Sequence, residues 1–239
     1  MTCTATPLNY PADNGATTCK GVVFRPDDAT GTLPVVMVTH AWDGLVQEVR
    51  DKAEKLAQAG YIAFAIDVYG DGKTESDPGK LMDTLGPYMA DRGLLTSRMQ
   101  AALAAAKGME GGDPSRIAAI GYCFGGTAVL DLARASDEVR GVVSFHGGLA
   151  GNDLSDASIS AKVLVLHGED DPLVPPEQVA AFKAEMKSRQ ADWQLVAYGD
   201  TMHGFTRPGA NNPDFGTVYS AGADARSWQA MLSFFDEVL

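Results

Sequence analysis

Cysteine, histidine and positive charge are all scarce in this chain. Its 239 residues include three cysteines and four histidines, with 19 lysines and arginines against 31 aspartates and glutamates. Three cysteines in a chain of this length do not form a disulfide framework. A bridge between Cys3 and Cys19 in the N-terminal segment is chemically possible, but free thiols are the simpler expectation. We therefore expect a cytoplasmic location.

The shortage of positive charge excludes one class of partner. The formal net charge is -12, and an acidic surface repels the phosphate backbone of nucleic acids. We therefore expect no nucleic-acid partner. The same background makes any arginine near a pocket informative, because an anionic substrate needs local positive charge.

Other absences concern membranes and metals. The sequence has no apolar run of about 18 residues or more, so we expect no membrane partner. Its first residues lack the basic start and the apolar core of a signal peptide. Neither an H-E-x-x-H motif nor paired C-x-x-C motifs occur, so we expect no metal and no cofactor. For the oligomeric state, monomer and homodimer both stay open.

The chain does contain a regular alternation of strand and helix patterns. Short continuous apolar runs favour buried strands, and amphipathic stretches between them favour helices. The predicted strands cover residues 20–25 (as an edge strand), 34–40, 61–68, 117–121, 141–145, 162–167 and 192–198. The predicted helices cover residues 46–59, part of 81–107, the segment after 123, 175–189 and 223–238. The alternation predicts an α/β fold, a mostly parallel sheet with helices on both faces. We expect a single domain over 1–239, with 1–19 as an N-terminal extension or edge segment.

One six-residue segment, Gly121-Tyr122-Cys123-Phe124-Gly125-Gly126, lies between a predicted strand and a predicted helix. This context is typical of a nucleophile elbow, here with cysteine where hydrolases usually carry serine. The glycines matter because the turn is strained, and a side chain at Gly121 or Gly125 would crowd the neighbouring strand or helix. The pattern is short, and a small buried cysteine with only a packing role is the alternative.

Two other strand ends supply the remaining groups of a triad. An acidic loop, residues 169–171, follows one strand, and Asp171 fits the H-G-x-x-D-x-x-V-P pattern of α/β-hydrolases better than Asp170 does. His203 lies in a glycine-flanked loop after the last strand. The order Cys123, Asp171, His203 matches the nucleophile–acid–histidine order of α/β-hydrolases. In a parallel sheet such strand ends meet at one edge, where catalytic groups gather.

These residue types suit acyl transfer. An ordinary thiol is only a few per cent thiolate at neutral pH, but a helix N-terminus and a nearby imidazole both favour the thiolate. We expect His203 to deprotonate Cys123, or to pair with it as an imidazolium, and then to protonate the leaving oxygen. Asp171 would orient His203. The backbone N–H groups of Phe124 and Trp42 are the expected oxyanion donors.

The same segments resemble the dienelactone hydrolase (carboxymethylenebutenolidase) family. The resemblance rests on residues 121–126, 167–171 and 203–205, and it extends to 67–70 and to the tail at 227–235. It runs from about residue 20 to the C-terminus, and the cysteine elbow makes it specific. It implies an eight-stranded α/β-hydrolase without a large lid, which opens lactones or esters through a Cys-His-Asp triad and an acyl-thioester. The type substrate is a dienelactone, converted to maleylacetate.

One position departs from the family pattern. Family members usually carry a glutamate close to the cysteine, in the loop after an early strand, where it helps to convert the thiol to thiolate. Ala41 occupies the matching position here, and Asp43 and Glu48 are the nearest other acids in the chain. We predict that Cys123 relies directly on His203. We also predict that a pocket lacking that carboxylate favours bulkier or neutral esters.

The resemblance further implies a substrate-binding arginine. Arg207 lies four residues after the predicted catalytic histidine, where family members bind a substrate carboxylate. Ala41 and Trp42 complete the expected binding surface. A second arginine is expected from an earlier segment, where the sequence leaves Arg92 and Arg98 as alternatives.

Hydrolysis of a small-molecule ester or lactone is the favoured function, with three alternatives. An open site with a soft, strong nucleophile would also attack activated phosphoesters or phosphotriesters. Cys123 would instead be a redox-active thiol if Cys3 or Cys19 could resolve it. A pocket that binds a ligand without chemistry fits less well, because three triad residues occur in the correct order.

Overall fold

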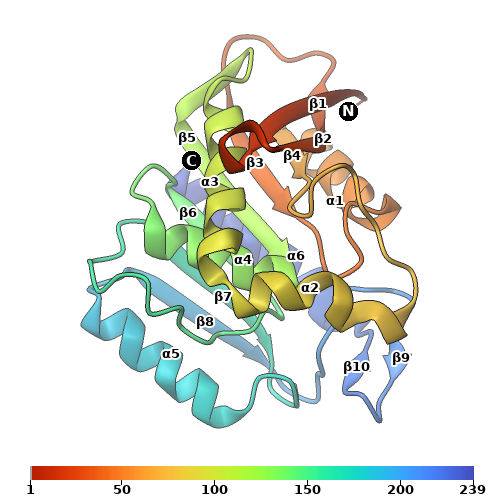
Figure 1. The fold of residues 1–239 in the computed structure, drawn as a ribbon, viewed down its shortest axis with the longest axis vertical. Helices are drawn as coiled ribbons and strands as arrows, with labels where there is room; N and C mark the ends of the chain where they lie inside the picture. Colours follow the sequence, from red (N-terminus) through yellow and green to blue (C-terminus); the bar gives the residue numbers. More distant parts are fainter. Residues whose placement is uncertain (1) are drawn as a thin grey trace.

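Eight strands form one sheet in the computed structural model, which describes residues 2–239 (Figure 1). The strands are β1 (Cys3–Ala12), β2 (Thr17–Pro26), β3 (Leu33–Thr39), β4 (Ile62–Ile66), β5 (Gly112–Tyr122), β6 (Gly141–Phe145), β7 (Lys162–Gly168) and β8 (Trp193–Tyr198). Their order in the sheet is β1-β2-β4-β3-β5-β6-β7-β8. The six strands from β4 to β8 are parallel, and β1 and β2 are antiparallel. The predicted fold class is confirmed.

The expectation that residues 20–25 form the edge strand is wrong. They belong to β2, which pairs with β4 on one side and with β1 on the other. The edge is β1, which contains Pro7 and Pro11 and exposes Thr4, Thr6 and Asn9. Proline cannot donate to a strand ladder, so it is tolerated at a sheet edge. The two prolines and the weak apolar pattern conceal this strand in the sequence.

Helices cover both faces of the sheet. They are α1 (Gln47–Gln58), α2 (Leu81–Ala90), α3 (Arg92–Lys107), α4 (Phe124–Ala135), α5 (Pro176–Ser188) and α6 (Ala221–Val238). In Figure 1, α3, α4 and α5 lie in front of the sheet, and α6 lies behind it. The region 81–107 forms two helices, because Asp91 interrupts the run and caps α3 by accepting a hydrogen bond from Leu94 N–H (2.9 Å).

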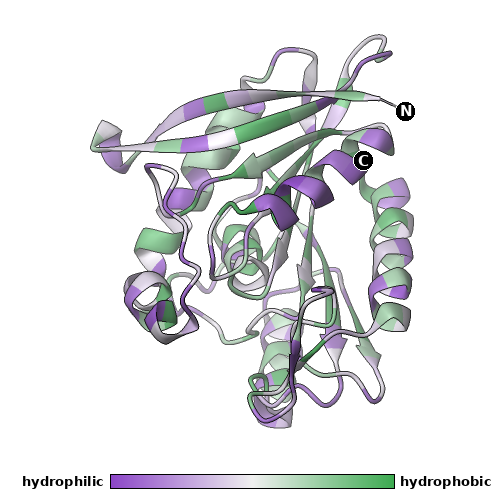
Figure 2. Cartoon of the chain, turned by 90° about the vertical axis from the view of Figure 1, so that its right-hand side faces the viewer, coloured by the Kyte–Doolittle hydropathy of each residue, from purple (hydrophilic) through white to green (hydrophobic). Residues whose placement is uncertain are grey.

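The sheet separates two hydrophobic cores. Alternate residues of a strand point to opposite faces, so Val35 and Met37 of β3 pack under α3 and α4, whereas Val36 and Val38 pack under α1 and α6. All four side chains are fully buried. Figure 2 shows this pattern as mostly apolar strands in the interior and polar segments along the outer helices. A strand covered on both faces reads as a continuous apolar run, which is why β3 could be predicted.

A hairpin and two 3-10 turns complete the fold. A two-stranded hairpin, β9 (Asn211–Asn212) and β10 (Thr217–Val218), follows β8. Single 3-10 turns occupy Asp13–Gly15 and Pro78–Lys80. Between residues 2 and 239, every helix is too short or too polar to cross a lipid bilayer.

Candidate active site

Cys123 lies at the tip of a sharp turn between β5 and α4. Its backbone has φ 54° and ψ -114°, a left-handed conformation that side-chain-bearing residues rarely adopt. The Cys123 N–H donates to the carbonyl of Phe145 on the neighbouring strand (3.0 Å), which holds the turn in place. The side chain is half-buried. Such strain at one residue occurs at functional sites and exposes the thiol at the N-terminus of α4.

The flanking glycines have the steric role that the sequence predicted. A Cβ atom at Gly121 would lie 2.0 Å from the carbonyl oxygen of Gly125, and one at Gly125 would lie 2.5 Å from that of His40. Both distances are far below any real contact. The strand, the turn and the helix can therefore pack this closely only because these two positions carry no side chain.

His203 and Asp171 meet at the same edge of the sheet. The Nδ1 of His203 hydrogen-bonds Oδ2 of Asp171 at 2.8 Å, and both side chains are buried. The other oxygen of Asp171 accepts from Leu173 N–H (2.9 Å). The β9–β10 hairpin fixes the histidine loop, since His203 N–H donates to Gly216 and its carbonyl accepts from Val218.

Opposing effects set the charge of His203. Burial alone would lower its pKa, but the negative charge of a Cys123 thiolate and the hydrogen bond to Asp171 raise the pKa to about 10. The Nε2 atom makes no well-aligned hydrogen bond to any residue among 2–239. Cys123 therefore acts on the imidazole mainly as a nearby charge. Loose geometry of this kind is common before substrate binds.

Two backbone N–H groups near the turn are available as donors. Phe124 is the first residue of α4, so its N–H has no acceptor within the helix. Trp42 follows β3, and its N–H has no hydrogen-bond acceptor within the described part of the chain. The structure thus leaves both predicted oxyanion donors unpaired.

Ala41 borders a small cavity of about 10 Å³, which Asp43, Glu48, Lys52 and Tyr122 also line. Burial raises the pKa of Glu48, although Arg207 and Lys52 act against this shift. The Glu48 carboxylate lies 3.4 Å from Arg207. Glu48 is thus engaged with an arginine.

All three candidate substrate-binding arginines have partners inside the protein. Arg207 lies 2.8 Å from Asp43, as well as near Glu48. Arg92 makes a two-bond contact with Asp131 (2.6 and 2.7 Å). Arg98 binds Asp13 of the 3-10 turn after β1, at 2.7 Å. The carboxylate-binding role expected of Arg207 stays a prediction, and its guanidinium already has two carboxylate neighbours.

Two residues that were not among the predicted site residues border the site. The Tyr69 hydroxyl donates to the carbonyl of Trp42 (2.7 Å). The His146 ring lies 5.0 Å from the His203 ring, edge to face, and its Nε2 is 2.9 Å from Thr206 Oγ1. Both follow buried strands at the carboxyl edge. That position was the sequence signal for His146, and Tyr69 also lies in segment 67–70, which contributes to the family resemblance. No group of three potential metal ligands gathers within residues 2–239.

Comparison with known proteins agrees with this geometry. The model of the dienelactone hydrolase family matches residues 19–239. The chain belongs to the dienelactone hydrolase family. A relative from Yersinia pestis, described as a candidate carboxymethylenebutenolidase, is 29% identical over 227 residues, which cover 90% of this chain and 82% of the relative. A counterpart from Escherichia coli K12 is 28% identical, with 89% and 80% covered.

Solved structures show the same similarity. A dienelactone hydrolase-like promiscuous phosphotriesterase from metagenomic libraries is 38% identical, with a TM-score of 0.94 and 100% and 99% of the two chains covered. A dienelactone hydrolase homologue from Klebsiella pneumoniae is 26% identical, with a TM-score of 0.82 and 99% of each chain covered. This dienelactone hydrolase family member is therefore a hydrolase with the α/β-hydrolase fold.

Proposed function

We propose that this chain hydrolyses carboxylic esters or lactones through a covalent thioester on Cys123. The observation that carries the proposal is the hydrogen-bonded His203–Asp171 pair, which lies beside a strained cysteine at a helix N-terminus. The family supports hydrolysis as the reaction class. The roles of the individual residues are our inference from their geometry.

In the first half-reaction, the Cys123 thiolate attacks the carbonyl carbon of the ester. The carbonyl oxygen becomes negatively charged, and the N–H groups of Phe124 and Trp42 stabilise it. The bond to the alcohol oxygen then breaks, and His203 donates its proton to that leaving oxygen. The alcohol departs, and the acyl group stays on sulfur as a thioester.

In the second half-reaction, His203 acts as a base. Acylation removes the thiolate charge, the strongest effect that raises the pKa of His203. The neutral imidazole then accepts a proton from water, which attacks the thioester carbonyl. The tetrahedral intermediate then collapses, the carbon–sulfur bond breaks and the carboxylic acid leaves. The Cys123 thiolate re-forms beside His203, which keeps the proton taken from water. The charge on Cys123 thus determines whether His203 acts as an acid, while the thiolate is present, or as a base, after acylation.

The charges around the candidate active site favour neutral substrates. The three candidate substrate-binding arginines, Arg92, Arg98 and Arg207, are all paired with internal carboxylates. The chain carries a net charge of -12. An anionic lactone would have to displace Asp43 or Glu48 from Arg207 before it gained a cation. Neutral aryl and alkyl esters need no such exchange.

Neutral phosphotriesters are a second candidate substrate class. The reason is specific, because the solved structure with 38% identity over the whole chain is described as a promiscuous phosphotriesterase. The same thiolate would attack phosphorus and expel an aryloxide, which His203 would protonate. Such substrates are also uncharged, consistent with the paired arginines.

The decisive experiment measures hydrolysis of 4-nitrophenyl acetate by the wild type and by Cys123→Ala, with intact-protein mass spectrometry to detect the acyl adduct. We expect the alanine variant to lose activity by a factor of about 10⁴ or more, as for other nucleophile deletions. Cys3→Ala is the matched control and should behave as wild type. Full activity in Cys123→Ala would exclude the triad.

The same assay with a neutral aryl ester, a matched carboxylate-bearing ester and an aryl phosphotriester tests the substrate class. We expect the neutral ester to have the highest kcat/KM of the three. A clear preference for the carboxylate-bearing ester would contradict the argument from the paired arginines. It would instead support the predicted binding of a substrate carboxylate by Arg207.

A further inference from the structure

Two loops at the carboxyl edge of the sheet are joined side by side. One is residues 40–44 after β3, which contains the proposed oxyanion donor Trp42. The other is residues 67–72 after β4. Val68 N–H donates to His40 Nε2 (3.1 Å), and the Tyr69 hydroxyl donates to the carbonyl of Trp42 (2.7 Å).

These bonds hold the peptide groups on both sides of Trp42. Because His40 Nε2 accepts from Val68, the ring proton is on Nδ1, and Nδ1 then donates to the carbonyl of Ala41 (2.7 Å). That carbonyl and the N–H of Trp42 belong to the same peptide group. The following peptide carries the Trp42 carbonyl, which is held by Tyr69.

Tyr69 is itself rigidly placed. Its side chain is buried, and its ring centroid lies 4.6 Å from that of His40 and 5.6 Å from that of Phe124. Burial and the charge of Cys123 raise its pKa well above the usual value, so the hydroxyl keeps its proton and stays a donor. The carboxylate of Asp67 accepts from the N–H groups of Gly70 and Gly72 (2.8 Å each), which fixes the loop that carries it.

We infer that Tyr69 is a positioning residue for the oxyanion hole: its hydroxyl holds the backbone of Trp42 so that the Trp42 N–H is directed for catalysis. The inference rests on the proposed thioester mechanism. Tyr69 touches neither substrate nor sulfur in this role and acts only through Trp42. A donor fixed in advance stabilises the developing oxyanion without reorganisation during the reaction, and this is what gives such donors their effect.

Tyr69→Phe removes the hydroxyl and keeps the ring. Both half-reactions pass through an oxyanion, so kcat for a neutral aryl ester should fall about 10-fold whichever step limits the rate, with KM within about twofold. Alkylation of Cys123 by iodoacetamide forms no oxyanion, and its rate should stay within about twofold of wild type. Binding of a trifluoromethyl ketone, which forms a tetrahedral oxyanion on sulfur, should weaken about 10-fold.

Tyr88→Phe is the matched control. Its hydroxyl is also buried and donates to a backbone carbonyl, that of Tyr69 (3.1 Å), but it makes no bond to residues 40–44. We expect wild-type kcat, alkylation rate and inhibitor affinity in this variant.

Each outcome decides the inference. Unchanged kcat in Tyr69→Phe overturns it, and so does a parallel fall in kcat and in alkylation rate, which would show general damage to the site. An equal loss in Tyr88→Phe would also overturn it, because the effect would then belong to the aromatic cluster. The proposed mechanism fails separately, through retained activity in Cys123→Ala.

Discussion

At the scale of single residues, His203 determines how the site responds to pH. Its pKa of about 10 lies above the usual 6.5 because of the thiolate charge and Asp171. The protonated form is therefore stabilised in the folded protein. This contribution to stability is fully present below pH 6.5 and is lost as the pH rises through about 10.

The same shift predicts the alkaline limit of activity. The kcat/KM for a neutral aryl ester should fall as His203 loses its proton near pH 10. Asp171→Asn removes the carboxylate charge and should move this limit down by about 1–2 pH units and reduce kcat. A pH–rate profile is the measurement. Asp170→Asn, at the exposed neighbouring acid, is the control and should leave the profile unchanged; an equal shift there would contradict the assignment of Asp171.

Sequence reasoning reached the candidate triad but missed the support of the oxyanion loop. The order of Cys123, Asp171 and His203 is visible in a linear pattern, because each follows a predictable buried strand. The contact of Tyr69 with Trp42 depends on two adjacent loops and on the direction of one hydroxyl. Nothing in local spacing carries that information. The internal partners of Arg207 were missed for the same reason.

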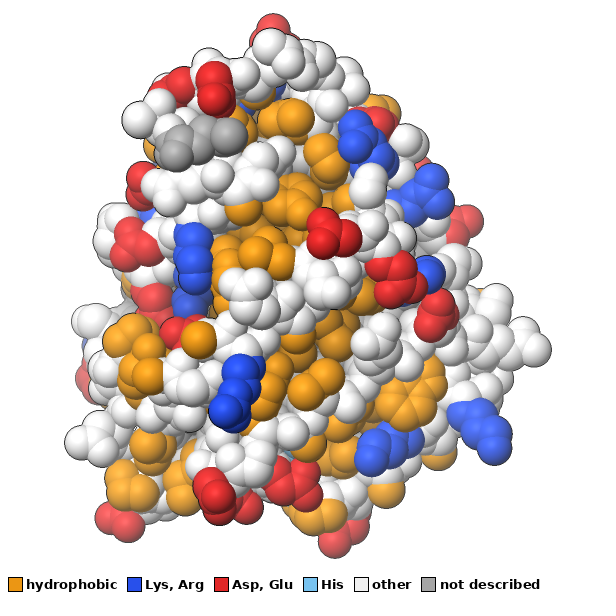
Figure 3. Space-filling view, turned by 180° about the vertical axis from the view of Figure 1, so that it is seen from behind, with side chains coloured by type: hydrophobic (Ala, Val, Ile, Leu, Met, Phe, Trp, Pro, Cys, Tyr) orange, Lys and Arg blue, Asp and Glu red, His pale blue; other side chains and the backbone are white. Residues whose placement is uncertain are grey.

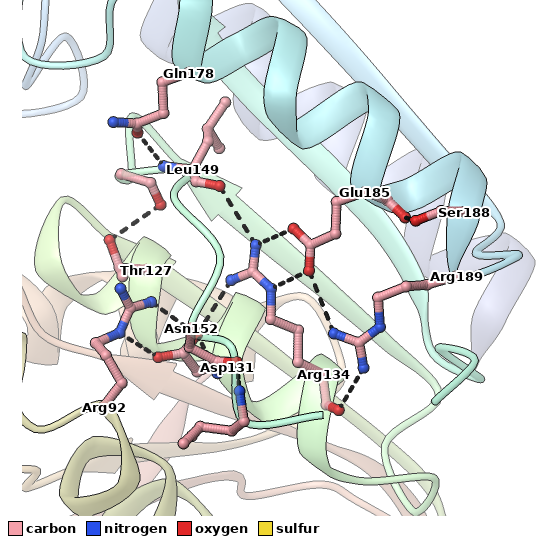
Figure 4. Close-up of polar contacts among 12 residues, drawn as sticks. Arg92, Thr127, Asp131, Arg134, Leu149, Asn152, Gln178, Glu185, Ser188 and Arg189 are labelled. Atoms are coloured by element: carbon pink, nitrogen blue, oxygen red, sulfur yellow. Dashed lines mark hydrogen bonds and ion pairs between the residues drawn. The ribbon is translucent and has the colours of Figure 1, made fainter. Parts of the chain in front are cut away.

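At the scale of elements, a buried polar network joins three helices on one face of the sheet (Figure 4). Asp131 on α4 is fully buried and accepts from Arg92 of α3, from Arg134 one turn along α4 and from Asn152 in the loop after β6. Arg134 also binds Glu185 of α5 at 2.8 Å. The network fixes α3, α4 and α5 relative to each other, and α4 carries Cys123 at its N-terminus.

Removing the central carboxylate charge should be costly. Asp131→Asn keeps the shape of the side chain but leaves the buried Arg134 short of a counter-charge, so we expect a loss of about 3 kcal/mol or more in the free energy of unfolding. Urea denaturation monitored by circular dichroism measures it. Glu138→Gln, in the exposed pair with Lys107, should leave the midpoint nearly unchanged. A similar midpoint in both variants would show that the network contributes little.

Elements also differ in how predictable they are. Strands β3, β6 and β7 are covered on both faces, so their continuous apolar runs fix them to within a residue or two. β1 lies at the edge, has polar residues outward and carries two prolines, so it shows no clear strand pattern. The short β9–β10 hairpin is held by the His203 loop rather than by its own propensity.

At the scale of the whole molecule, acidic groups are distributed over the surface. Figure 3 shows the rear face with scattered acidic and basic side chains around apolar ones, without one dominant basic area. With a net charge of -12, the long-range field repels anions. Salt screens such a field over about 10 Å at 0.1 M ionic strength.

This field predicts a salt effect that depends on substrate charge. The kcat/KM for a neutral aryl ester should change by less than about twofold between low and high ionic strength, whereas that for the matched carboxylate-bearing ester should rise several-fold, as screening removes repulsion. Steady-state rates over a sodium chloride series test this. A fall for the anionic ester would show that local positive charge governs its binding.

The ion pairs of Arg207 also bear on how the specificity of such a protein can diverge. The cation needed to recognise an anionic substrate is already present, and the carboxylates of Asp43 and Glu48 occupy it. A descendant could therefore change its preference for substrate charge by losing these two acidic side chains, one in the loop after β3 and one in the first turn of α1, without acquiring any new basic residue. The reverse change is equally simple, because one or two acidic substitutions beside an unpaired arginine would neutralise an existing anion site. The removal of acidic side chains beside Arg207 is therefore a route to a change in specificity for substrate charge.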